Sequence, residues 1–106
     1  MKKKSAIVKL QLILSNNELN RLKISETSNG DIRITADVHG MKCIQAKRFI
    51  NNIINVIQMV FTLIIIHGYN HGTAIKDMLA TDFANAHIKA NYLDPHNQGV
   101  THLVIA

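Results

Sequence analysis

Hydrophobic residues recur with two different periods along the chain, and these periods separate the predicted strands from the predicted helices. After a turn at residues 27–31, apolar Ile32 and Ile34 alternate with polar residues, which predicts a half-buried strand. From Cys43 the apolar residues recur every three or four positions, which predicts a helix. The stripe that this helix is expected to bury comprises Ile44, Ala46, Ile50, Ile53, Ile54 and Ile57. The continuous apolar run at 61–66 then predicts a central strand.

The second half of the chain predicts one more helix and two more strands. Thr73 is a suitable N-cap for a helix whose apolar stripe comprises Ile75, Met78, Leu79 and Phe83. Residues 88–93 predict a strand, 94–99 a turn, and 100–106 a closing strand. The order β-α-β-α-β-β predicts an α/β fold, a two-layer α+β sandwich. It has a mixed four-stranded sheet with two helices on one face.

Residues 1–30 carry a weaker pattern and are treated as an N-terminal extension, with the domain proper at 31–106. Residues 1–4 are a basic tail, and 5–14 alternate only partly, which fits a strand or an extended arm. Capping residues at 15–18 precede a short predicted helix. Two interpretations of residues 1–30 remain: an ordered extension of the domain, and an arm that reaches a partner.

Composition limits the class of protein and of partner. The 106 residues, 47% of them hydrophobic and 18% charged, fit one globular domain. The net charge of +5 and pI of about 9.6 favour an anionic partner such as nucleic acid, although the tail at 2–4 supplies three of those charges. Few aromatic residues favour contacts to a nucleic-acid backbone over base stacking. The single cysteine, Cys43, excludes an internal disulfide and fits the cytoplasm.

Two segments are considered as membrane-directed: residues 49–66 as a membrane helix and the N-terminal segment as a signal peptide. The residue pattern of each argues against it. Residues 49–66 carry no formal charge over 18 positions, but five polar residues lie within them and their period changes partway. A helix followed by a strand explains this segment better. The N-terminal segment lacks the uninterrupted apolar run and the cleavage site of a signal peptide. We therefore expect no membrane partner.

Histidines follow both strands that flank the first predicted helix. His39 and Gly40 end the strand that begins at Ile32, and His67 and Gly68 end the strand at 61–66. Because the carboxyl ends of adjacent parallel strands meet at one edge of a sheet, we expect the two histidines to be neighbours. The loop after His67 opens a helix, and the unpaired N–H groups of a helix N-terminus favour anions. This edge is therefore predicted to bind a phosphate group.

The residue types at this edge fit phosphodiester chemistry. Histidine side chains in general titrate near neutral pH, so His39 is a candidate general base or acid. Asp37 lies two residues earlier, on the same face of the strand, and is expected either to orient His39 or to hold a divalent cation. His67 is a candidate hydrogen-bond donor to the same phosphate. Backbone N–H groups of the loop are expected to cradle its non-bridging oxygens. The predicted phosphate-binding loop comprises Gly68, Tyr69, Asn70, His71, Gly72 and Thr73.

These motifs resemble those of the small MutS-related (Smr) domain family. Residues 37–40, Asp-Val-His-Gly, resemble its Asp-x-His-Gly signature, and residues 67–72 stand where that family has His-Gly-x-Gly-x-Gly. The similarity covers residues 31–106. It implies a βαβαββ fold and an endonuclease that nicks DNA or cuts RNA with little sequence specificity. Family members are also described as nuclease-like modules, and the resemblance suggests a link to DNA repair, recombination or RNA quality control.

Carried over by position, the resemblance implies a cleaving pair and a glycine-rich loop. Asp37 and His39 match the acidic and histidine residues implicated in cleavage, while His67, Gly68 and Gly72 match the loop. The sequence departs from the family at three positions: Asn70 replaces the middle glycine, Tyr69 stands where a basic residue is frequent, and His71 where a small residue is frequent. These departures bear on catalysis more than on the fold.

Several alternatives stay open at this point. The predicted backbone-tracking residues are Lys42, Lys47, Arg48 and Lys76. A tightly bound metal is not assigned, although a divalent cation such as Mg²⁺ or Mn²⁺ is compatible with the chemistry. A non-catalytic nucleic-acid-binding module and a protein-interaction domain of a repair or translation complex are the competing functions. DNA and RNA, and a monomer and a weak dimer, likewise remain alternatives.

Overall fold

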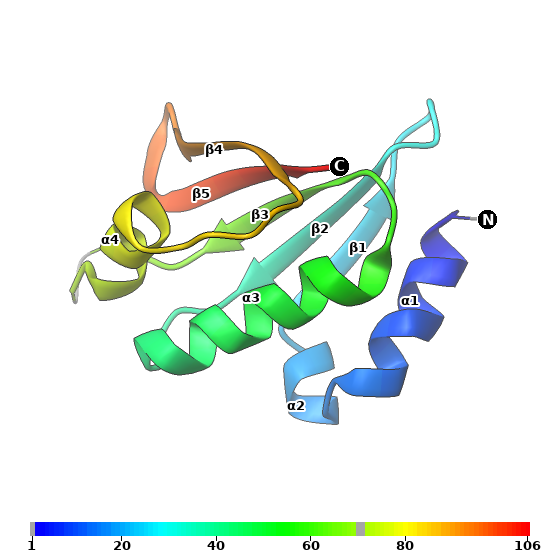
Figure 1. The fold of residues 1–106 in the computed structure, drawn as a ribbon, viewed down its shortest axis with the longest axis horizontal. Coiled ribbons are helices and arrows are strands. Elements are labelled where there is room, and N and C mark those ends of the chain that lie inside the picture. Colours follow the sequence, from blue (N-terminus) through cyan, green and yellow to red (C-terminus); the bar gives the residue numbers. More distant parts are fainter. Residues whose placement is uncertain (1, 70–71) are drawn as a thin grey trace.

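The computed structural model describes residues 2–69 and 72–106, and within them the chain forms a mixed five-stranded sheet and four helices (Figure 1). The helices are α1 (Lys2–Ile13), α2 (Asn16–Leu19), α3 (Cys43–Ile57) and α4 (Ala74–Thr81). The strands are β1 (Leu22–Glu26), β2 (Ile32–Asp37), β3 (Phe61–Ile66), β4 (Ile88–Asp94) and β5 (Asn97–Ile105). The predicted α/β class and the two-layer arrangement are confirmed. The predicted four strands are one too few.

The sheet has the strand order β1-β2-β3-β5-β4. Its central pair, β2 and β3, is parallel, and Asp37 lies opposite Ile66 at the carboxyl ends of both strands. The other three pairings are antiparallel. The crossover through α3 therefore brings the ends of β2 and β3 to one edge, as the sequence predicts.

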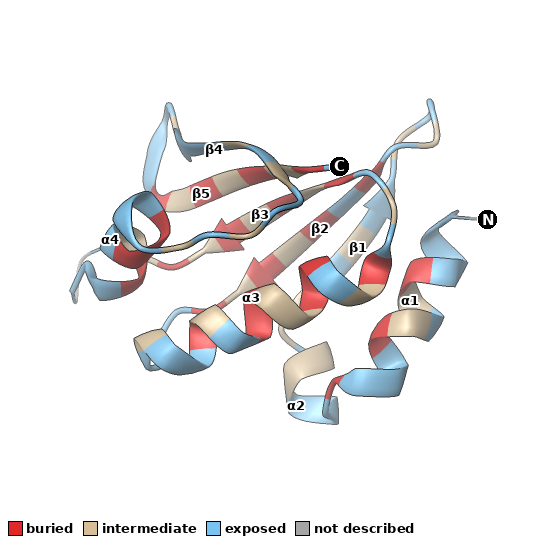
Figure 2. Ribbon diagram, viewed as in Figure 1, coloured by how far each residue is buried: buried red, intermediate tan, exposed pale blue. Residues whose placement is uncertain are grey.

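The core lies on one face of the sheet. Along β2, β3 and β5, buried residues alternate with partly exposed ones (Figure 2), as period-two patterning requires. Ile34, Leu63 and Leu103 lie side by side on three neighbouring strands and are fully buried. Buried residues of α1, α3 and α4 belong to the same core cluster, so these helices cover the same face. The partly exposed residues of these strands lie on the opposite face of the sheet.

The N-terminal segment differs most from its prediction. Residues 5–14 are neither a strand nor an extended arm, because they lie within α1 and its C-terminal end, and the basic residues at 2–4 form the first turn of that helix. Ala6, Leu10 and Leu14 are spaced four residues apart and are buried in the core cluster. β1 then pairs with β2 as an edge strand. The extension is thus an ordered part of the same core.

Three smaller differences concern single residues. Ile44, predicted as core, is 68% exposed at the start of α3, and Phe49 is buried instead. Phe83 lies beyond the end of α4 and packs against the core from the following loop. β5 begins at Asn97, because a tight turn closes the hairpin earlier than predicted.

The uncharged segment 49–66 forms most of α3 and the whole of β3. Among residues 2–69 and 72–106, no helix combines the length and apolarity needed to cross a membrane.

Candidate functional site

The candidate site lies where β2 and β3 end. Beyond the last strand residues, the Val38 N–H donates a 2.9 Å hydrogen bond to the Ile66 carbonyl, which carries the pairing one step further. The chain then turns at Gly40, whose φ of 80° is in the left-handed region that favours glycine. His39 and His67 both line the pocket at this edge, so the predicted proximity of the two histidines is confirmed.

Asp37 and His39 form a hydrogen-bonded pair. The Asp37 Oδ1 atom accepts a 3.2 Å hydrogen bond from the His39 backbone N–H and also contacts the His39 ring at Nδ1. A carboxylate at Nδ1 fixes the ring orientation and directs Nε2 away from Asp37. The His39 side chain is 68% exposed, so the ring is open to solvent. Of the two roles considered for Asp37, this geometry matches orientation of the histidine.

Arg21 holds the backbone on which this pair stands. Its Nη1 atom donates to the Asp37 carbonyl at 3.1 Å and to the His39 carbonyl at 3.3 Å. The Arg21 carbonyl in turn accepts a 2.9 Å hydrogen bond from the Asp37 N–H. The N-terminal extension therefore contributes directly to the geometry of the candidate site.

His67 occupies a different environment from His39. It is 6% exposed, and both ring nitrogens have partners inside the protein. Because the Gly68 carbonyl only accepts, Nδ1 carries the proton and donates to it at 2.8 Å, and Nε2 is paired with the Thr101 hydroxyl at 2.8 Å. Burial lowers the pKa of His67; the Gly68 hydrogen bond opposes this shift and the nearby Lys76 charge adds to it. His67 is thus a neutral residue that fixes the loop.

The loop after β3 is fastened to β5 by its backbone. The N–H groups of His67 and Gly68 both donate to the Gly99 carbonyl, at 2.9 and 3.0 Å. The Gly68 N–H is therefore engaged within the fold, contrary to its expected role in cradling a phosphate. Gly99 permits this approach because a Cβ there would lie 3.2 Å from the Gly68 Cα and 3.4 Å from a ring carbon of Tyr69.

A pocket of about 590 Å³ lies between these elements. It is lined by His39, Gly40, Met41, Ile66, His67, Gly68, Tyr69, Gly72, Ala74, Ile75, Asn97, Gly99 and Val100. The N-termini of α3 and α4 meet beside it, where the Cys43 Sγ lies 3.6 Å from the Ala74 carbonyl. Two helix N-termini at one site favour negative charge.

The other residues of the predicted phosphate-binding loop differ in their surroundings. Thr73 is the N-cap of α4, as predicted, but its hydroxyl donates to Asp77 Oδ2 at 2.8 Å instead of capping a backbone N–H. Gly72 lines the pocket with a φ of 128°. Asn70 and His71 lie outside the described residues.

The four predicted basic residues are not equivalent. Lys76, in the first turn of α4, lies near enough to His67 to influence its titration. Lys42 is an exposed residue at the N-cap of α3. Lys47 pairs with Asp82 at 3.6 Å and is thereby directed towards the end of α4. Arg48 and Arg21 line a second pocket. This second pocket shares Gly40 and Met41 with the main pocket.

Sequence reasoning missed two polar residues of this site. Thr101 could have been found from the sequence, because it alternates with Leu103 and Ile105 on the same face of the closing strand. This face is buried, so Thr101 is a buried polar residue that needs a hydrogen-bond partner. Arg21 carries no such signal, since its partners are backbone carbonyls 16 and 18 residues away.

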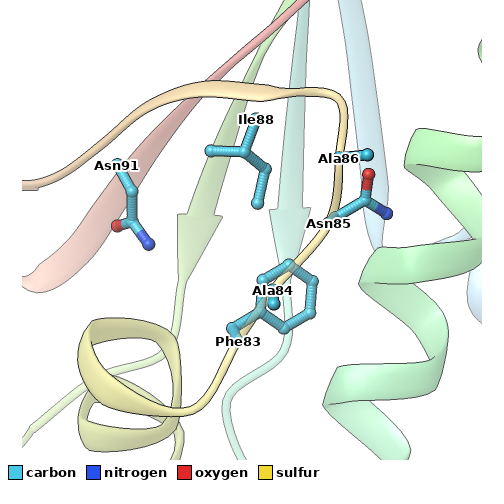
Figure 3. Close-up of a pocket in the computed structure, with 6 residues that line it drawn as sticks. All are labelled: Phe83, Ala84, Asn85, Ala86, Ile88 and Asn91. Atoms are coloured by element: carbon cyan, nitrogen blue, oxygen red, sulfur yellow. The ribbon is translucent and has the colours of Figure 1, made fainter.

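Other hollows and polar clusters lie away from this edge. Figure 3 shows a pocket between the 82–87 loop and β4, and none of the six residues that line it is titratable. Its Asn85 amide donates to Asn51 Oδ1 at 3.0 Å, and its Asn91 amide donates to the Leu79 carbonyl at 2.8 Å. These side chains fasten the loop and the strand to neighbouring helices. The pocket has no acid or base for chemistry.

On the uncovered face of the sheet, His102 pairs with Asp94 and stacks on Tyr92. The His102 Nε2 lies 2.7 Å from Asp94 Oδ2, and the two rings are 5.1 Å apart and nearly parallel. The hydrogen bonds from His102 and from the His96 N–H lower the pKa of Asp94. The His102 side chain is largely buried in this arrangement.

The described residues offer a limited set of metal ligands. Within 2–69 and 72–106, no three histidine, cysteine, aspartate or glutamate side chains are grouped as a metal site would require.

In comparisons with known proteins, no family model, curated protein or solved structure matches this chain.

Proposed function

We propose that this chain is an Smr-like domain that binds nucleic acid and cleaves a phosphodiester bond of one strand, with little sequence preference. The observation that carries the proposal is the Asp37–His39 pair, which stands at the rim of a pocket beside two helix N-termini. An oriented imidazole next to an anion-favouring surface supplies two contributions to phosphodiester cleavage, a general base and stabilisation of negative charge. The resemblance of residues 37–40 and 67–72 to the Smr motifs supports the same activity.

In the proposed reaction, His39 Nε2 takes the proton of the attacking hydroxyl, either of water or of an RNA 2′-hydroxyl. The oxygen attacks phosphorus, the bond to the leaving oxygen breaks, and that oxygen takes up a proton from the imidazolium or from water. Asp37 holds the ring and stabilises its protonated form. General acid–base catalysis of this kind typically contributes about 10²–10⁴-fold. A cytoplasmic DNA or RNA substrate fits the proposal equally.

The helix N-termini and the basic side chains would bind the phosphate backbone. Lys76 stands on the first turn of α4 and Lys42 is the N-cap of α3, so both lie at the helix N-termini beside the pocket. Because such contacts release counterions, affinity should fall steeply with salt. Contacts of this type carry little information about base sequence.

A non-catalytic binding module is the second candidate, and one observation favours it. The Gly68 N–H and both His67 ring nitrogens are engaged inside the protein, so fewer donors face a transition state than the Smr-like loop suggests. In this case the same edge would bind nucleic acid without cutting it.

A cleavage assay separates the two candidates. Wild type, Asp37→Asn, His39→Ala and the control His96→Ala, whose histidine lies in the exposed β4–β5 turn, would be incubated with supercoiled plasmid and single-stranded RNA, with and without Mg²⁺ or Mn²⁺. We expect cutting by wild type and His96→Ala, and at least a 100-fold loss in the other two. Normal cutting by His39→Ala would refute the mechanism. Salt-sensitive binding without cutting by wild type would favour the binding module.

A further inference from the structure

The walls of the pocket beside His39 are mainly apolar. The aliphatic and thioether residues that line it are Met41, Ile66, Ala74, Ile75 and Val100, and the exposed His39 lies at the rim. A phosphate moved into such surroundings would lose its hydration without enough donors in return. The phosphate group therefore belongs at the mouth, near the helix N-termini, and the interior fits a flatter and less polar group.

Tyr69 adds an aromatic surface to this pocket. It lines the pocket and is still 46% exposed, so much of the side chain is open to a ligand. One edge of its ring lies against Gly99, where a Cβ would lie 3.4 Å from a Tyr69 ring carbon. β5 therefore supports the ring on that side. A supported, exposed ring beside apolar walls is the arrangement on which nucleobases stack.

The volume of the pocket agrees with a ligand of this kind. At about 590 Å³ it falls in the range of roughly 300–1,000 Å³ that is typical of small-molecule sites. A nucleobase with its sugar is of that class, whereas a base pair inside a duplex cannot enter without being unpaired.

We infer that this pocket seats one unpaired nucleobase against Tyr69, so that the substrate is single-stranded or locally unpaired nucleic acid. The inference rests on the proposed function, because it takes the phosphate next to that base to be the one presented to His39. The few aromatic residues of the sequence favour contacts to the nucleic-acid backbone. The proposed pocket adds a contact to one base.

The test compares probes of equal length that differ in the presence of bases, in the sugar and in strandedness. Binding of the full chain would be measured by fluorescence anisotropy with a 12-mer of thymidine, a 12-mer of uridine, an abasic 12-mer with the same phosphates, and a 12-base-pair duplex. We expect both base-bearing single strands to bind about tenfold or more tightly than the abasic strand and the duplex. The thymidine and uridine probes separate DNA from RNA as the preferred source of the base.

Matched variants locate the effect. Tyr69→Ala should lower affinity for the thymidine 12-mer to that of the abasic strand, and Tyr69→Phe should retain it. Tyr92→Ala is the control, because Tyr92 is a similarly exposed tyrosine, 48% against 46%, on the edge strand β4. Unchanged affinity of Tyr69→Ala would overturn the inference.

The failure of this inference differs from the failure of the proposed function. If wild type binds the abasic strand as tightly as the thymidine strand while His39→Ala still abolishes cutting, the base pocket is refuted and the nuclease stands. If none of the four probes binds, both are refuted, and an apolar segment of a protein becomes the better occupant of the pocket.

Discussion

Arg21 donates a hydrogen bond to the carbonyl of His39, although 18 residues separate them in the chain. A second bond from the same nitrogen reaches the Asp37 carbonyl. The segment between α2 and β1 thereby fixes the backbone of the proposed catalytic pair. A domain that begins at residue 31 would lack this support.

Replacement of Arg21 should therefore reduce activity as well as stability. Arg21→Ala removes two hydrogen bonds to carbonyls, and we expect a loss of about 1–2 kcal/mol in the free energy of unfolding. Displacement of the His39 backbone should also lower kcat by roughly tenfold or more. Urea unfolding and cleavage kinetics would measure the two effects. Lys23→Ala, at an exposed position of β1, is the control and should change neither by a comparable amount.

The helix α1 provides a direct test of whether the extension belongs to the core. Leu10 is fully buried and Leu12 is 78% exposed, so the same substitution can be compared at two sites on one helix. Leu10→Ala should cost about 2–5 kcal/mol of unfolding free energy, and Leu12→Ala should change it by less than about 0.5 kcal/mol. Equal effects in thermal or urea unfolding would show that α1 does not pack as described.

The elements with a clear period were predictable from the sequence. Ile32 and Ile34 alternate with polar residues, and Ile50, Ile53 and Ile57 follow a helical stripe, so β2 and α3 appear where they were expected. Parallel β2 and β3 then required the two histidines to share an edge. Local pattern and global fold agree in this part of the chain.

The N-terminal elements escaped prediction for a physical reason. α1 has apolar residues around most of its circumference, such as Val8 and Leu12 on the exposed side and Leu10 on the buried side, so no single stripe marks it as a helix. β1 is a short edge strand with exposed Lys23 and Ser25, and its pairing with β2 defines it. Tertiary contacts decide both elements.

The candidate site was only partly predictable for a similar reason. The Asp37–His39 pair follows from their two-residue spacing at the end of β2. The environment of His67, by contrast, depends on Thr101, 34 residues away, and on the Gly99 carbonyl. A histidine that looks available in the sequence is therefore committed to the fold.

The His67–Thr101 bond should contribute measurably to stability. Thr101→Val keeps the shape of the side chain but leaves the buried Nε2 of His67 without its hydroxyl partner, at a cost of about 1–3 kcal/mol. Thr101→Ser retains the hydroxyl and is the comparison variant. Urea unfolding should rank the serine variant above the valine variant. The reverse order would mean that the hydroxyl contributes less than the methyl group.

The titration of His67 predicts a pH dependence of stability. Its pKa is lowered in the folded state, so the unfolded chain binds more protons below the ordinary histidine value of 6.5. The contribution of neutral His67 is therefore fully present above that value and is lost as the pH falls towards the lowered pKa. Unfolding free energies measured between pH 7.5 and 5 should decline, and His67→Gln should decline less steeply. Parallel curves for the two proteins would contradict this account.

The most direct test of the central claim is chemical rescue of His39→Ala by imidazole in the cleavage assay. If His39 transfers the proton, free imidazole should enter the vacated space and restore part of the lost cutting, with a dependence on imidazole concentration that wild type does not show. The purely structural variant Thr101→Val should not respond. Cutting by His39→Ala at the wild-type rate, or a complete absence of rescue by imidazole in an otherwise folded His39→Ala protein, would contradict the assignment of His39 as the acid–base group.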